Sequence, residues 1–378
     1  MTYPINFMTT ENTQTIRYTQ LSGQWGTRLV LLALTCAFVC APALTLAAGP
    51  ASTLPTTSTS FEQPVSFDPL RPVFKGTPVT QARASLSADG KTLEVSAGDY
   101  RTRFDSRTSW TMRSVFYKTA NIDQSEGGAF LQCVLNENHG QVDASGKKVD
   151  PFLGSGHRPE QIDQLVVELY AGTKRLSREA VVAGLKPQVG GDTVVVRKLS
   201  RFVSAYNGLL MKLDYTTVIT PAGVEQYARL TPGDGDITKI NFFYPVMQMY
   251  PNATQDWVAF SENKVVEAGV FKDDNSFSLG KRLSAFVTFN PETKTGIYLY
   301  HPADYAGGVH NIWHRKGDNK LYFKYPRFKS VDDVRDYRLF LTAFPCTGLT
   351  SEPPAESSGW KAVSFPSGGE SAKFWIKE

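Results

Sequence analysis

The chain has 378 residues, of which 41% are hydrophobic and 20% charged, so it has enough apolar material for a large buried core. Its formal net charge is only +4 and the basic residues form no long run, so we expect no nucleic-acid-binding face. The sequence also lacks a Gly-rich phosphate loop, a dinucleotide-binding fingerprint, a zinc-type cysteine pattern and a nucleophile elbow.

Residues 1–48 have the pattern of a signal peptide. A polar stretch with Arg17 and Arg28 precedes the apolar run Leu29–Cys40, and small residues follow it. The run has about a dozen residues, whereas a spanning helix needs roughly twenty. We therefore expect cleavage, no stable membrane span after processing, and a periplasmic or secreted protein; an uncleaved anchor is the alternative.

Residues 49–79 are predicted to be a linker and lead-in, because the Ser/Thr/Pro-rich stretch Ala51–Ser60 has almost nothing to bury. Residues 80–378 are then expected to form a single domain. Two cysteines remain beyond the leader, Cys133 and Cys346. In an oxidising compartment they form one long-range disulfide or stay as two buried thiols, and the sequence leaves both alternatives open.

Strand signals recur throughout residues 80–378. The clearest hairpin has alternating apolar residues on both sides of the turn Thr220-Pro221-Ala222-Gly223. Helix signals are few, with one turn at Pro159–Leu165 and a short helix at Ser177–Leu185. We therefore predict an all-β fold, a large antiparallel β-sandwich with few short helices. The predicted hairpins and late strand are Ala84–Val95, Val166–Leu176, Leu209–Leu230, Leu283–Tyr300 and Tyr337–Phe344.

The most suggestive polar segment is Gly154-Ser155-Gly156-His157-Arg158-Pro159-Glu160. Its glycines allow a close backbone approach to a ligand, and an imidazole, a guanidinium and a carboxylate follow within four residues. Arg158 can form a bidentate pair with a sugar carboxylate or sulfate, and His157 can exchange a proton. A glycine turn with a surface histidine is the alternative.

A second group of histidines comes late in the chain, with His301 directly after a predicted strand. The spacing of His310 and His314 would let both bind one metal ion from the same face of a helix. On a strand they share a face about 13 Å apart, which is too far for one ion. We expect a polar loop rim near a ligand, with a divalent cation site and plain surface histidines as alternatives.

Aromatic residues make up 12% of the chain, and their flat faces can stack on pyranose rings. Most of them are expected in the core. A pocket rim with two of them, Trp313 and Tyr305 among the candidates, is nevertheless expected.

The long hairpins resemble the strand pattern of galactose mutarotase-like β-supersandwiches, especially from Leu213 through Thr220-Pro221-Ala222-Gly223-Val224-Glu225. The run Asp336-Tyr337-Arg338-Leu339-Phe340-Leu341 resembles a last core strand of that fold. The resemblance implies a carbohydrate-active protein: this fold occurs in aldose epimerases, which pair a histidine with a carboxylate, and in lyases, which often use His, Tyr and Arg.

These observations favour a carbohydrate-active enzyme on an oligo- or polysaccharide, with a uronate-polysaccharide lyase among the candidates. A glycoside hydrolase and a sugar epimerase are other options, and a non-catalytic carbohydrate-binding or envelope structural protein is the main alternative. We expect no cofactor, no metal and no nucleic acid, and an anionic polysaccharide as one possible partner. The catalytic candidates are His139, His157, Glu160, His310 and His314, and the substrate-binding candidates are Arg158, His301, Tyr305, Trp313 and Arg315.

Overall fold

The computed structural model describes residues 81–122, 134–158, 160–261, 264–301, 308–315, 319–356, 358–364 and 373–378. These residues belong to the compact unit Ser60–Glu378. Residues 1–79 and Cys133 lie outside the described residues, so the leader, the linker and the disulfide stay predictions, while Cys346 is buried. Among the described residues, no helix has the length and apolar character needed to cross a membrane.

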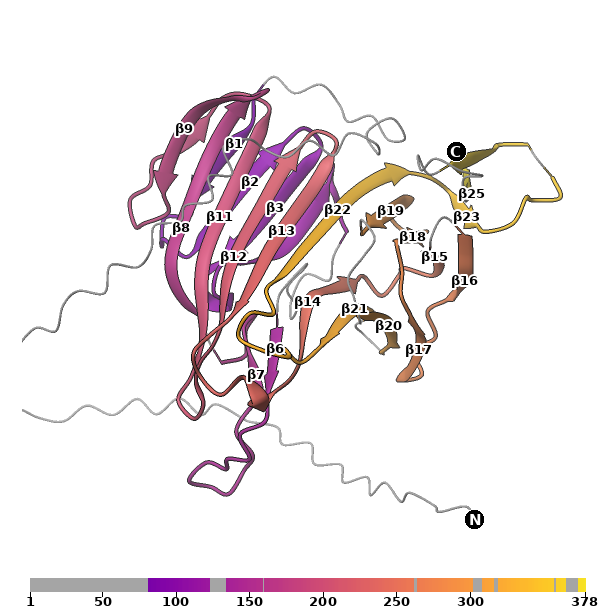
Figure 1. Ribbon diagram of the computed structural model, residues 1–378. Coiled ribbons are helices and arrows are strands. Elements are labelled where there is room, and N and C mark those ends of the chain that lie inside the picture. The colour runs from indigo at the N-terminus through magenta and orange to yellow at the C-terminus, as the bar shows by residue number, and fades with distance from the viewer. Residues whose placement is uncertain are drawn as a thin grey trace, which may run out of the picture. The chain divides into compact units, whose positions relative to one another are not determined.

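The longest sheet, here called the central sheet, has ten strands in the described part of the chain (Figure 1). Its neighbouring strands are antiparallel, as in the pairs β11–β12 and β13–β22. In spatial order the strands are β16 (Lys264–Val270), β15 (Asp256–Ser261), β18 (Ala285–Asn290), β19 (Thr295–Tyr300), β22 (Arg335–Pro345), β13 (Gly223–Pro232), β12 (Gly208–Thr220), β11 (Thr193–Ser204), β8 (Gln161–Ala171) and β9 (Lys174–Ala180).

Three further sheets are present among the described residues. The first outer sheet contains β10 (Gln188–Val189), β1 (Arg83–Leu86), β2 (Thr92–Ala97), β3 (Tyr100–Asp105), β4 (Thr111–Tyr117) and β5 (Ala120–Asn121). The second outer sheet contains β17 (Ser276–Lys281), β20 (Val309–His314), β21 (Asn319–Pro326), β14 (Ile240–Tyr250), β6 (Val134–Glu137) and β7 (Phe152–Leu153). The small sheet contains β23 (Gly348–Thr350), β25 (Lys373–Lys377) and β24 (Trp360–Ser364).

One large core joins the central sheet to both outer sheets. It includes Leu93 of β2 together with Leu213 of β12, and Phe323 of β21 together with Leu339 of β22. In Figure 1 the strands β1, β2 and β3 lie behind β8, β11 and β12, in agreement with these core contacts. A second cluster, which includes Phe340 and residues of the small sheet, covers the other face of the central sheet at β15, β18, β19 and β22. The arrangement confirms the predicted all-β sandwich.

The hairpin predicted at Leu209–Leu230 is confirmed as β12 and β13, joined at Thr220–Gly223. Gly223 has a φ of +151°, and a Cβ atom there would lie 2.2 Å from the carbonyl oxygen of Leu341 on β22. The glycine therefore lets β13 approach β22 closely at the start of their pairing. The other predicted hairpins are confirmed as β1–β2, β8–β9 and β18–β19, and the late strand is part of β22.

Both predicted helices are wrong within the described residues. The chain from Gln161 onward forms β8, whose residues Leu165–Tyr170 are buried while their backbone pairs with β9 and β11. Ser177 belongs to β9, an edge strand of the central sheet. Its charged sequence suits an exposed sheet edge, and the same polar composition suggested a surface helix. The described helices are two 3₁₀ turns, η1 (Ser106–Thr108) and η2 (Ile237–Lys239).

Candidate functional site

The turn that carries His157 follows β7 of the second outer sheet. Gly154, Ser155 and Gly156 all have positive φ angles, of 91°, 51° and 87°. The His157 N–H donates to the Gly154 carbonyl at 3.1 Å, and the Gly154 N–H donates to the Arg158 carbonyl at 2.8 Å. The glycines thus allow a tight left-handed turn that most residues would strain, and this turn presents the imidazole at the surface.

His157 is paired with a carboxylate that the sequence analysis did not single out. Its Nδ1 atom lies 2.8 Å from Oδ2 of Asp150, and the two side chains are 39% and 42% exposed. The ring packs against Phe152 with a centroid distance of 5.0 Å. An ionised Asp150 accepts a hydrogen bond from Nδ1–H, which leaves the lone pair of Nε2 available in the neutral imidazole. This is the arrangement that a general base needs.

His139 lies on the other side of Asp150. Its Nδ1 accepts the Gln141 N–H at 3.0 Å, and its Nε2 lies 3.4 Å from the Asp150 carbonyl oxygen. Its ring packs on Tyr206 with a centroid distance of 4.9 Å. Both ring nitrogens of His139 therefore face protein atoms.

A buried carboxylate, Glu137, lies beneath these loop residues. It is bonded by the Arg158 guanidinium and by the Asn207 amide. Burial raises the pKa of Glu137, but hydrogen bonds from Ser204, Arg158 and Asn207 outweigh burial, so its pKa lies below the ordinary value. Glu137 is therefore ionised and neutralises Arg158.

Arg158 also contacts the exposed side of this region. Its Cζ atom lies 5.8 Å from the ring centroid of Tyr206, which is 44% exposed. We call His139, Asp150, His157, Arg158 and Tyr206 the His157 cluster. The structure thus brings together three predicted site residues, His139, His157 and Arg158.

Glu160 is not part of this cluster. It is only 6% exposed, and its Oε2 lies 2.9 Å from Nζ of Lys198 and accepts the Ser200 hydroxyl at 2.6 Å. The Glu160 backbone N–H donates to Oγ of Ser109. These contacts place the carboxylate in an interior ion pair between β8 and β11, away from a ligand-accessible position.

The late histidines lie in the interior rather than on the expected loop rim. His301 and His310 are both 0% exposed, and their ring centroids are 4.7 Å apart. Nδ1 of His301 lies 3.0 Å from the Tyr337 hydroxyl, and Nδ1 of His310 accepts the Leu283 N–H at 3.1 Å. Burial lowers the pKa of His301 to about 3 and that of His310 well below its ordinary value. Both rings are therefore neutral in the folded chain.

His314 is also buried, and β20 places it on the same face as His310. Its Nδ1 accepts the Lys272 N–H at 3.3 Å, and its Nε2 lies 2.8 Å from the Ser278 hydroxyl. The segment is a strand and not a helix, which removes the geometry for a shared metal ion. Within the described ranges, no group of three His, Cys, Asp or Glu side chains is placed to hold a metal.

Trp313 and Arg315 lie together but away from the buried histidines. The Arg315 guanidinium carbon is 4.9 Å from the Trp313 ring centroid, and Phe277 stacks on the same indole at 5.4 Å. Tyr305 lies outside the described residues.

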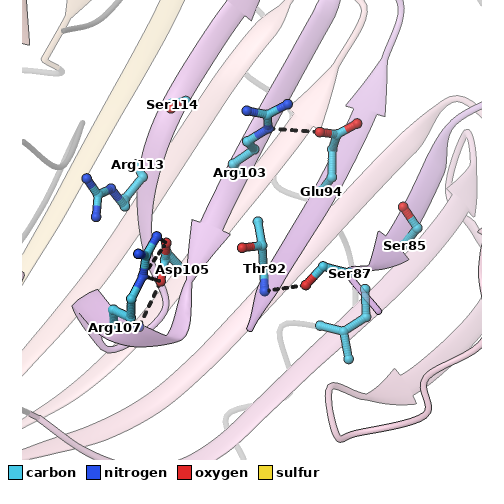
Figure 2. Close-up of a pocket in the computed structure, with 10 residues that line it drawn as sticks. Ser85, Ser87, Thr92, Glu94, Arg103, Asp105, Arg107, Arg113 and Ser114 are labelled. Carbon is cyan, nitrogen blue, oxygen red and sulfur yellow. Dashed lines mark hydrogen bonds and ion pairs between the residues drawn. The ribbon is translucent and has the colours of Figure 1, made fainter. Parts of the chain in front are cut away.

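A hollow of about 510 Å³ opens on the first outer sheet, and Figure 2 shows its polar lining. Its charged groups are largely paired with one another: Arg103 Nε lies 2.9 Å from Glu94, and the Arg107 guanidinium donates to both carboxylate oxygens of Asp105. None of the site residues predicted from the sequence lines this hollow. The pairing of its charged side chains with one another accounts for their positions without a ligand.

No protein-family model and no curated protein matches this sequence. Several solved structures do match the structure of this chain. The fold is similar to that of galactose mutarotase-like proteins. One from Lactobacillus casei has a TM-score of 0.42 and 11% identity, covering 67% of this chain and 100% of its own. Another from Clostridium acetobutylicum has a TM-score of 0.38 and 6% identity, covering 70% of this chain and 98% of its own.

An α-N-acetylgalactosaminidase from Bifidobacterium bifidum has a TM-score of 0.40 and 11% identity. The match covers 66% of this chain but only 36% of the glycosidase. The galactose mutarotase-like proteins among these solved structures are the group that the hairpin pattern resembles. Similarity at this level identifies no site in this chain.

Proposed function

We propose that this protein acts on a polysaccharide and that His157 is the base that removes a proton from the bound sugar. The observation that carries the proposal is the His157–Asp150 pair, with Nδ1 and Oδ2 2.8 Å apart on an exposed turn. In the described contacts Nε2 of His157 has no partner, and the Phe152 ring beside it offers a flat surface for a pyranose ring.

The reaction class that fits best is proton abstraction beside a uronate carboxylate, followed by elimination. His157 takes the proton, the C–H electrons form a C=C bond, and the C–O bond to the neighbouring sugar breaks. The departing oxygen keeps that bond's electron pair and takes a proton from an acid, for which Tyr206 is our assignment. Arg158 is already neutralised by Glu137, so it orients Tyr206 and is less suited to neutralising a substrate.

Hydrolysis is a weaker fit because it requires one carboxylic acid and one carboxylate beside the scissile bond. Asp150 is paired with His157, and Glu137 is bonded by Arg158 and Asn207. The lowered pKa of Glu137 keeps it ionised and prevents it from acting as the acid. The leader pattern in residues 1–48 supports the accompanying proposal that the enzyme works in the periplasm or outside the cell.

Replacing His157 by Gln is expected to lower kcat by ~10²–10⁴-fold, because general base catalysis typically contributes that much. Asp150→Asn should lower kcat as well, since it removes the acceptor that fixes the imidazole tautomer. The assay follows the ultraviolet absorbance of the unsaturated product on polygalacturonate and alginate, beside a reducing-end assay for hydrolysis. Asp143→Asn is the matched control, because Asp143 is exposed in the same loop and only caps its own turn.

Unchanged kcat in both His157→Gln and Asp150→Asn would contradict the assignment of the base. The alternative is a non-catalytic carbohydrate-binding protein, which the half-buried Phe152 ring beside His157 and the exposed Tyr206 ring beside Arg158 also favour. That alternative predicts measurable binding, no product from any member of a glycan panel, and equal affinity in the wild type and the His157→Gln variant.

A further inference from the structure

One buried carboxylate of the central sheet faces three guanidiniums. Glu168 lies on β8, and its side chain is only 1% exposed. Nε of Arg178 lies 3.4 Å and Nη1 of Arg175 lies 3.6 Å from its Oε1 atom, and Nε of Arg197 lies 3.6 Å from Oε2. The Tyr170 hydroxyl donates to Oε2 at 2.8 Å. We call Glu168 and the three arginines the Glu168 site. Three guanidiniums against one carboxylate leave two positive charges in excess.

The Glu168 site lies on the face of the central sheet that is turned away from the large core. Side chains alternate between the two faces of a strand. Val167 and Leu169 belong to the large core, so Glu168 between them points to the opposite face. Arg178 is directly opposite Glu168 in the register of β8 and β9. Figure 1 shows β9 at the end of the central sheet, and the side chains of this strand are mostly exposed.

Other arginines of the central sheet are bound more closely by their carboxylates. Arg201 donates to both carboxylate oxygens of Asp163 at 2.6 to 3.0 Å, and Arg229 donates to those of Asp336 at 2.7 and 2.8 Å. These are the distances of charge-assisted hydrogen bonds, with one carboxylate for each guanidinium. At the Glu168 site the distances are longer, and two guanidiniums share a single oxygen. Their hydrogen-bonding capacity therefore exceeds what Glu168 uses.

Two of the three arginines are open to solvent. The side chains of Arg175 and Arg178 are 52% and 47% exposed. Because a nitrogen of each lies within 3.6 Å of the same oxygen, one oxyanion can bridge both guanidiniums from the solvent side. Asp192, a carboxylate beside the β8–β9 turn, instead accepts hydrogen bonds from the Gly172 N–H and the Thr193 hydroxyl.

We propose that Arg175 and Arg178 bind a doubly charged tetrahedral oxyanion, either a free sulfate or phosphate ion or the phosphate group of a sugar ester. The planar guanidinium presents paired N–H groups that match two oxygens of such a group. The two excess positive charges match a dianion, and the buried Glu168 holds the two guanidiniums near each other. The inference does not rest on the proposed function, because none of these residues belongs to the His157 cluster and binding alone tests it.

Calorimetric titration of the full chain with sodium sulfate and with sodium phosphate tests the proposal. Arg175→Gln and Arg178→Gln are each expected to weaken binding by about tenfold, since each removes one charge and one pair of donors. Arg178→Lys keeps the charge but loses the planar fork, so it should weaken binding by about threefold. The matched control is Arg201→Gln, whose affinity should equal that of the wild type, because the 41% exposed Arg201 is already paired with Asp163.

A series of ligands tests the charge and the source of the oxyanion. Methanesulfonate resembles sulfate but carries one negative charge, so it should bind about tenfold more weakly. Equal affinity for the two ions would overturn the assignment to a dianion. Glucose 6-phosphate binding more tightly than phosphate would support a sugar ester as the ligand, whereas equal affinity would support a free ion. Glucose is the uncharged control.

Two other results would overturn the site itself. One is a sulfate affinity in Arg175→Gln and Arg178→Gln equal to that of the wild type. The other is the absence of saturable binding of sulfate and phosphate up to about 10 mM. A loss in Arg201→Gln as large as that in Arg178→Gln would also count against the site, because it would show a general effect of surface charge.

Discussion

Replacing Lys198 by Met is expected to destabilise the domain by about 3–5 kcal/mol, because it leaves the Glu160 carboxylate buried without a compensating charge. The two side chains are 5% and 1% exposed, and Nζ lies 2.9 Å from Oε2. Urea unfolding followed by tryptophan fluorescence measures the change in the free energy of unfolding. The double variant Lys198→Met/Glu160→Gln should recover part of the loss, since it removes both charges.

An exposed pair provides the control for this effect. Arg201 and Asp163 are both 41% exposed and 2.6 Å apart, so Arg201→Met should change stability by less than about 1 kcal/mol. A loss below about 1 kcal/mol in Lys198→Met would mean that Glu160 reaches solvent. Glu160 would then return as a candidate for the acid of a hydrolase.

Acidification should also destabilise the folded chain, through the buried pair His301 and His310. Burial lowers the pKa of His301 to about 3 and that of His310 well below its ordinary value, whereas both rings titrate near 6.5 in the unfolded chain. The unfolded chain therefore binds more protons below pH 6.5. The two rings do not lower the free energy of unfolding above about pH 6.5. Below that pH, the free energy of unfolding falls by up to about 1.4 kcal/mol per pH unit for each ring as the pH decreases. The decrease caused by His301 is complete near pH 3, where its ring also becomes protonated in the folded chain.

The slope of unfolding free energy against pH measures this linkage. His301→Gln/His310→Gln should have a shallower slope between pH 6.5 and pH 4 than the wild type, whatever its absolute stability. An unchanged slope in the double variant would show that the two rings are not neutral in the folded state.

The hairpins could be predicted because their information is local. Alternating residues and the turn at Thr220–Gly223 specify β12 and β13 without knowledge of distant segments. The end of the edge strand β9, from Ser177 onward, was predicted as a short helix; the side chains of this strand are mostly exposed. Its strand state follows from pairing with β8, which no pattern within the segment reveals.

Three residues of the candidate site, His139, His157 and Arg158, could be predicted because they lie in turn-rich segments. The glycine turn identified His157 and Arg158, but Asp150, Phe152 and Tyr206 join them through contacts between separate loops and strands.

His310 was expected in a loop but lies in the strand β20. Two glycines before it suggested a loop, yet it alternates on β20 with Asn311 and shares the inner face with Ile312. Period-two alternation was present in the sequence here. Since Trp313 on the other face is also apolar, the pattern did not say which face would be buried.

The most direct test of the account is a crystal structure of His157→Gln with a short oligogalacturonate. We expect a sugar ring stacked on Phe152, with one uronate beside residue 157 and its acidic C–H directed at that side chain. An oligosaccharide bound elsewhere, for example in the Arg103 and Arg107 hollow of the first outer sheet, would contradict the assignment of His157 as the base.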